Sequence, residues 1–420
     1  MEKKDISLRD RRILSIDRFR GGLVLCMVLF MVMERFPALG WLASIGSHGE
    51  TAGVHLMGDL MLADVVAPMF IFCIGLSYLP SLRRRIARDG RRAAYLHFIA
   101  RYLSIMGMGY AMRVVDFFVS RGWRDPLTTI GFVLSAVALV TAIGLLICML
   151  IPKATKAKAG FSKAMQAVLA VLGILSLYAG CKGVYAHVFL RQLNAAHWSV
   201  LQAIGFAGLV TLLFAECSTL ARGIIGGLML ITFGFVHQLP AIGPEPAMTL
   251  SQLIDSFVQG GIIGGFSWAS LLTLSTVFAD LYHNDLAARD AGKRGPGACT
   301  YLFGMLVAVT VGIAALLLLP VSMGSVSPGY ILVTLGASTV ILFIVSLFEN
   351  LHLKGDVLAW WGRSPIFAYL LCYIVHDVIP ILMGDTDAVA FFPALAYSLG
   401  ITLLMTWVLW LLSRKKTVHF

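Results

Sequence analysis

Three residues that could carry out chemistry stand close together in one apolar stretch: His55, Asp59 and Asp64. The stretch reads HLMGDLMLADVVAPMFIFCIGLS and predicts a membrane helix over 57–80. An ionised Asp at the centre of a bilayer costs at least ~2.5 kcal/mol, so carboxylates in such a helix usually serve a function. His55 and Asp59 are four residues apart and share a helix face, which lets the carboxylate hold the imidazole by a hydrogen bond. Asp64 lies on the opposite face from His55, so we expect it to meet a different neighbour.

These residue types suit acid and base chemistry. A neutral imidazole, with an unperturbed pKa of ~6.5, can abstract a proton near neutral pH. The same buried carboxylates would also suit proton or substrate coupling in a transporter. For Asp64, a third interpretation is a structural partner for a buried Arg, Tyr or backbone group.

The composition of the chain indicates an integral membrane protein. The chain has 420 residues, of which 59% are hydrophobic and 13% charged, too few polar groups to cover a soluble globule. We expect an all-α polytopic bundle of 11–12 transmembrane helices. Apolar runs of about 20 residues predict spans near 21–36, 57–80, 97–118, 127–151, 164–186, 199–216, 222–238, 261–282, 299–320, 329–348, 365–383 and 392–412.

The net charge is +11. The positions of the basic residues along the chain indicate membrane topology rather than nucleic-acid binding. With both chain ends on one side, all but six of the 33 lysines and arginines fall on that side, which the positive-inside bias makes cytoplasmic. The six others are Arg35, Arg113, Arg121, Arg124, Lys182 and Arg191. We therefore expect a cytoplasmic basic arm (1–20), one transmembrane domain (21–412) and a cytoplasmic tail (413–420), with no cleavable signal peptide before them.

The seven cysteines lie in or beside apolar runs, with no CxxC and no Cys/His metal spacing. The sequence therefore predicts neither a disulfide scaffold nor a metal site.

Three segments resemble one family of membrane proteins. LADVVAPMFIFCIGLS with His55 upstream is similar to the signature of the membrane-bound acyltransferases related to heparan-alpha-glucosaminide N-acetyltransferase. SIDRFRG at 15–21 resembles the start of that family, and AWWGRSPIFAYLLCYIVHDV resembles its late segment. The resemblance covers the first two spans and the eleventh, while the middle of the chain matches only in being apolar.

The resemblance implies transfer of acetyl from cytosolic acetyl-CoA to an extracytoplasmic amine or hydroxyl, commonly on an amino sugar or glycan. His55 would be the base or a transient acyl carrier, so direct transfer and an acyl-His intermediate both stay open. Asp59 would orient His55, and Asp64 completes the catalytic set. Arginines suit bidentate phosphate contacts, and those expected to hold coenzyme A are Arg18, Arg20, Arg83, Arg84 and Arg363. Tyr373 and His376 are the expected acceptor-binding residues.

Several alternatives remain open at this point. The arginines of RRRIARDGRR also fit a plain topology determinant, and Asp17 with Arg20 could simply cap a helix. A proton-coupled secondary transporter of a small solute is the main competing function, and a non-catalytic membrane partner of polysaccharide assembly is the third. We expect a multi-pass protein of a bacterial inner membrane, with a homodimer as one assembly to test and no nucleic-acid partner.

Overall fold

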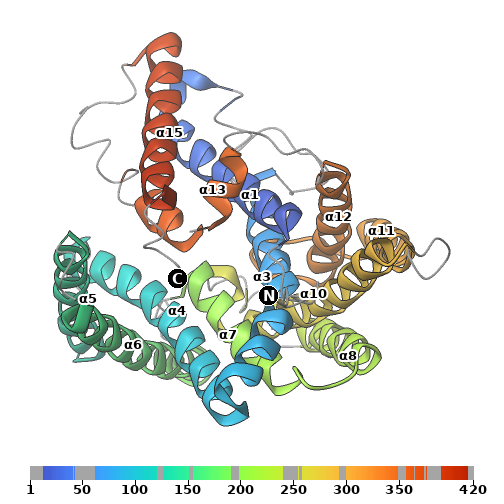
Figure 1. The fold of residues 1–420 in the computed structure, drawn as a ribbon. Helices are drawn as coiled ribbons and strands as arrows, with labels where there is room; N and C mark the ends of the chain where they lie inside the picture. The colour runs from blue at the N-terminus through green and yellow to red at the C-terminus, as the bar shows by residue number, and fades with distance from the viewer. Residues whose placement is uncertain are drawn as a thin grey trace. The chain divides into compact units, whose positions relative to one another are not determined.

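The computed structural model is all α-helical (Figure 1). It describes residues 13–40, 42, 62–120, 126–150, 155–190, 198–239, 254, 258–292, 299–348, 356–363, 365–372, 375 and 389–414. The principal helices are α1 (Leu14–Met33), α3 (Leu62–Asp89), α4 (Arg91–Ser120), α5 (Pro126–Leu150), α6 (Thr155–Leu190), α7 (Val200–Leu213), α8 (Thr219–Gln238), α10 (Gly261–Asp290), α11 (Thr300–Leu318), α12 (Pro328–Leu347), α13 (Val357–Arg363) and α15 (Phe391–Arg414). Short 3₁₀ turns are η2 (Pro37–Leu39) and η3 (Val258–Gly260).

Eight helices in the described part of the chain are long and apolar enough to cross a membrane, which makes this a multi-pass membrane protein. They correspond to eight of the twelve predicted spans. The first predicted span is α1, which carries Asp17, Arg18 and Arg20 near its start, and the sixth is α7, which has only 14 residues. The third is α4, which is helical but is not one of the eight. The eleventh lies largely outside the described residues.

The helices of the described chain pack into two compact units. The single transmembrane domain expected over 21–412 stays a prediction. The first unit contains residues 1–76, 281–321 and 332–420, and the second contains 77–280 and 322–331. Helices α3, α10 and α12 each continue from one unit into the other.

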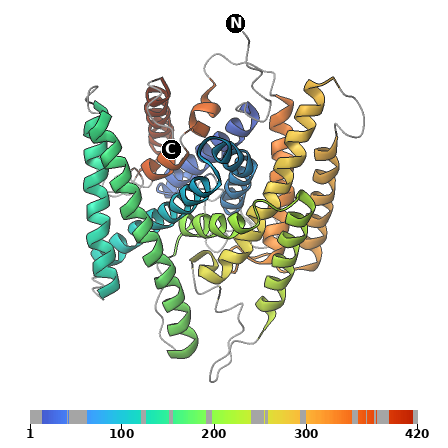
Figure 2. The ribbon, with the colours of Figure 1, turned by 60° about the horizontal axis from the view of Figure 1, so that its bottom comes forward.

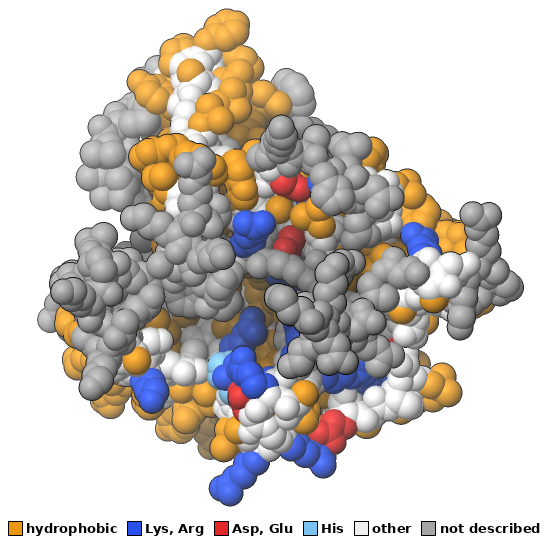
Figure 3. Space-filling view, viewed as in Figure 1, with side chains coloured by type: hydrophobic (Ala, Val, Ile, Leu, Met, Phe, Trp, Pro, Cys, Tyr) orange, Lys and Arg blue, Asp and Glu red, His pale blue; other side chains and the backbone are white. Residues whose placement is uncertain are grey.

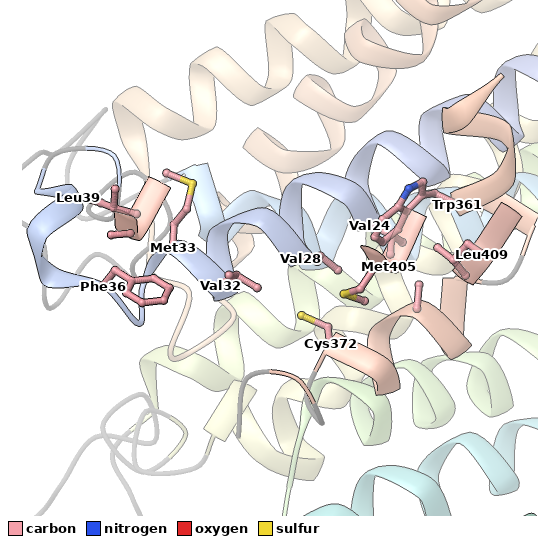
Figure 4. Packing of buried hydrophobic residues seen from close by; sticks show 12 residues of the cluster. Val24, Val28, Val32, Met33, Phe36, Leu39, Trp361, Cys372, Met405 and Leu409 are labelled. Carbon is pink, nitrogen blue, oxygen red and sulfur yellow. The ribbon is translucent and has the colours of Figure 1, made fainter. Parts of the chain in front are cut away.

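The core of the first unit forms where α1 packs against α13, α15 and the helical residues 365–372. Val24, Val28 and Val32 recur every four residues and so line one face of α1. Figure 4 shows them pointing toward Trp361 and Cys372, with Met405 of α15 between. All of these side chains are at most 2% exposed.

The core of the second unit is built around α4, which packs against α5, α6 and α7. Figure 2 shows α5 and α6 running side by side. A Cβ atom on Gly107 of α4 would overlap the carbonyl oxygen of Leu169 in α6, and one on Gly173 of α6 would overlap that of Leu103. Such close backbone approach is the usual way in which membrane helices gain packing energy without a hydrophobic driving force.

Two segments expected to connect spans are helical instead. Helix α3 continues through the basic run to Asp89, and α4 begins at Arg91 directly after a single glycine, Gly90, with φ of 82°. Helix α6 begins at Thr155, inside the stretch KATKAKAGFSK between the fourth and fifth predicted spans. The physical reason is that Arg, Lys and Ala favour helix after the apolar run has ended, so hydropathy locates the membrane edge and not the end of the helix.

Candidate functional site

The first turns of α1 carry a network of buried polar contacts within the first unit. Arg18 is 5% exposed, and its Nε donates to Oδ2 of Asp356 at 2.6 Å. Its Nη1 donates to the carbonyl oxygen of Phe348 at 2.6 Å. Asp356 in turn accepts a hydrogen bond from the backbone N–H of Ala359 at 3.1 Å and so caps the start of α13. One buried guanidinium therefore links α1 to the end of α12 and the start of α13.

Two glycines bring the backbones of α1 and α13 into direct contact. A Cβ on Gly21 would overlap the carbonyl oxygen of Leu358, and a Cβ on Gly362 would overlap the carbonyl oxygen of Asp17. Gly22 differs, because nothing lies within 4 Å of a Cβ placed there. The glycine at position 21 is thus required by packing, and α13 is held in a fixed register against α1.

The opposite neighbour of α1 is α3. Phe19 packs edge-on against Phe72, with ring centroids 6.3 Å apart. Arg20 donates through Nη2 to the carbonyl oxygen of Cys73 at 3.3 Å. The described parts of the three segments that carry the family resemblance therefore meet at α1, although the first and the last are more than 300 residues apart in sequence.

Two acids contribute to this region that sequence reasoning did not select: Asp356, described above, and Asp285. Asp285 is 3% exposed and accepts hydrogen bonds from the backbone N–H groups of Thr300 and Tyr301 at 3.0 and 2.8 Å. It therefore caps α11 from α10. Beside it, the hydroxyls of Ser15 and Tyr282 lie 2.7 Å apart, which ties α1 to the end of α10. The sequence around Asp285, LYHNDLAARD, is polar and holds a second acid, so no sequence signal distinguishes Asp285.

Asp64 is the one predicted catalytic residue within the described chain. It lies in the first turn of α3 and is 2% exposed. Cys73, the acceptor for Arg20, lies nine residues further along the same helix, which is about 14 Å of axial rise. His55, Asp59, Tyr373 and His376 lie outside the described residues.

The predicted coenzyme A ligands divide between the two units. Arg363, exposed at the end of α13, belongs to the first unit with Arg18 and Arg20. Arg83 and Arg84 belong to the second. Arg83 pairs with Asp280 at 3.4 Å, and Arg84 is exposed and donates to the carbonyl oxygen of Pro80 in its own helix.

A second buried ion pair, which the sequence did not indicate, lies in the second unit. Arg222 is fully buried and pairs with Asp280, which also contacts Arg83. Further hydrogen bonds run from Arg222 to the hydroxyl of Thr276 at 2.5 Å and to the carbonyl oxygen of Cys217 at 3.2 Å. This network joins the ends of α3, α8 and α10, so we assign it a structural role.

Within the described residues, no three His, Cys, Asp or Glu side chains come together as metal ligands. No protein-family model and no curated protein matches the chain.

Proposed function

We propose that this protein is an acetyl-CoA-dependent acyltransferase of a bacterial inner membrane, acting on an extracytoplasmic amino sugar or glycan. The supporting observation is the meeting of three segments around α1. SIDRFRG, the α3 segment and AWWGRSP each resemble parts of one acyltransferase family, and each contacts another through named atoms.

The family resemblance implies the reaction. The acceptor's amine or hydroxyl forms a bond to the acetyl carbon, the C–S bond of the thioester breaks, and the proton passes through His55 to the departing thiolate. If His55 is itself acylated first, the same bonds form and break in two steps. Asp59 orients the imidazole. Asp64, which is 2% exposed, is proposed as the third member of this set.

Binding of the two substrates is assigned to separate sets of residues. Tyr373 and His376 are proposed to hold the acceptor. Phosphates of the donor are proposed to contact guanidinium groups. The candidates are Arg20 and Arg363 within the first unit, or Arg83 and Arg84 within the second. Arg18 is better described as a positioning residue, because its buried side chain is engaged by Asp356 and by the carbonyl oxygen of Phe348.

A proton-coupled transporter is the second candidate, because the buried Asp64 suits proton binding equally well. The two functions differ in what happens to acetyl-CoA. A transporter neither binds nor cleaves acetyl-CoA, whereas the enzyme must bind acetyl-CoA and release coenzyme A.

Calorimetry of acetyl-CoA binding to the purified full chain tests the proposal. The variants are His55→Ala and Asp64→Asn, with Asp89→Asn as a control that alters an exposed acid of the same helix. We expect micromolar binding of acetyl-CoA in all four proteins. Transfer of acetyl to added glucosamine, with release of free coenzyme A, should occur only in wild type and Asp89→Asn. If wild type shows no heat of binding up to millimolar acetyl-CoA, the protein does not bind the acetyl donor. That result would contradict the acyltransferase proposal and favour the transporter.

A further inference from the structure

The corner between α3 and α4 carries a dense group of exposed arginines in the second unit. Arg88 and Arg91 have side chains that are 68% and 72% exposed, and Arg92 is also exposed. Blue side chains gather at the lower edge of Figure 3, where Figure 1 draws this corner. Gly90, with φ of 82°, makes the turn tight enough to bring the end of α3 and the start of α4 together.

Local acids neutralise only part of this charge. Asp89 pairs with Arg85 at 3.2 Å and with Arg88 at 2.8 Å, and Arg91 pairs with Glu216. For Arg92, no acidic partner is found among the residues that the structure describes. Four arginines therefore face two carboxylates, and the ion pairs are exposed enough for a stronger anion to compete with them.

The same helix face changes from charged to apolar within one turn. Leu96 and Ile99 follow Arg92 by four and seven residues, so they continue its face of α4, and they are 57% and 38% exposed. Large exposed apolar side chains on a membrane helix indicate contact with acyl chains. Tyr95 directly precedes Leu96 in α4, and the Arg91 guanidinium lies 6.0 Å from the centroid of its ring. Burial, together with a hydrogen bond to Glu216, raises the pKa of Tyr95. A half-buried Tyr between charged and apolar rows is typical of the membrane interface.

We infer that this corner binds the phosphodiester headgroup of an anionic phospholipid. We define the corner patch as Arg88, Arg91 and Arg92 with Leu96 and Ile99. Arg88 and Arg92 approach the phosphate from the ends of two helices, and the acyl chains lie along Leu96 and Ile99. The apolar row selects a lipid over a soluble phosphate or a coenzyme A molecule, because neither of those would use it. The inference does not depend on the acyltransferase proposal.

Lipid binding to the purified full chain in detergent, followed by native mass spectrometry, tests this site. The probes are dioctanoyl phosphatidylglycerol, dioctanoyl phosphatidylcholine and inorganic phosphate. We expect saturable binding of the anionic lipid only. Each arginine near an anionic surface should contribute about fivefold in affinity, so Arg88→Gln combined with Arg92→Gln should weaken lipid binding about 25-fold.

The matched control is Arg289→Gln, which removes one exposed arginine from the last turn of α10 outside the corner patch. It should leave lipid affinity unchanged. A second variant, Leu96→Ser, should weaken lipid binding without creating phosphate binding. Equal lipid affinity in wild type and the double variant would overturn the inference. Competition by millimolar phosphate or coenzyme A would also overturn it, because the ligand would then be a soluble phosphate.

Discussion

Removing either partner of the Arg18–Asp356 ion pair should destabilise the protein, but by unequal amounts. The pair joins an Arg side chain that is 6% exposed to an Asp side chain that is 16% exposed. Asp356→Ala leaves the guanidinium buried without its counter-charge, which costs about 3–5 kcal/mol. It also removes the cap on α13, which contributes about 1 kcal/mol more.

Arg18→Met should cost less. The Met side chain keeps most of the apolar stem, and Asp356 retains both partial exposure and the N–H of Ala359. The carbonyl oxygen of Phe348 loses a donor. We expect a loss of about 2–3 kcal/mol in the free energy of unfolding. The double variant, Arg18→Met with Asp356→Ala, leaves no unpaired charge. Its loss in the free energy of unfolding should therefore be about 2 kcal/mol smaller than the sum of the two single losses.

Unfolding of the full chain in mixed micelles with increasing SDS, followed by Trp fluorescence, measures these differences. Asp356→Asn is a useful control, because Asn keeps the cap and removes only the charge. Its cost should lie between those of Arg18→Met and Asp356→Ala. If Arg18→Met costs as much as Asp356→Ala, or if the two effects add, then the ion pair does not stabilise α1 and α13 as argued.

Three further predictions concern backbone positions and caps, each measured by the same unfolding assay. Gly21→Ala should destabilise by about 3 kcal/mol through overlap with α13, whereas Gly22→Ala should stabilise by up to about 1 kcal/mol; equal effects would contradict the close packing. Gly90→Ala should cost about 1–2 kcal/mol because φ is 82°, while Gly160→Ala, in helical backbone with open space around it, should not be destabilising. Asp285→Ala should cost about 2 kcal/mol by uncapping α11, and a neutral result would mean that water replaces the carboxylate.

Apolar runs were sufficient to predict the membrane class and most of the helices, because the cost of placing polar groups in lipid leaves a strong pattern. The ends of the helices were harder to predict. The predicted spans place the arginines after Ser81 in a connection between the second and third spans. Helix α3 instead continues to Asp89. The breaking residue was Gly90, which hydropathy does not detect.

The candidate site was predictable only where residue type carries the signal. Asp64 was selected because an acid in an apolar helix is unusual, and it is buried as that reasoning expects. The partner of Arg18 was not predictable, because Asp356 lies 338 positions away in an unremarkable polar stretch. Likewise, Gly21 and Gly22 look equivalent in sequence, and only the position of α13 distinguishes them.

Transfer of labelled acetyl across a sealed membrane tests the central proposal most directly. The full chain is reconstituted in proteoliposomes with acetyl-CoA outside and glucosamine inside, and wild type is compared with His55→Ala. We predict labelled N-acetylglucosamine in the lumen with wild type, and none with the variant although it still binds acetyl-CoA. Intact acetyl-CoA in both preparations, together with solute uptake driven by a proton gradient, would contradict the acyltransferase account.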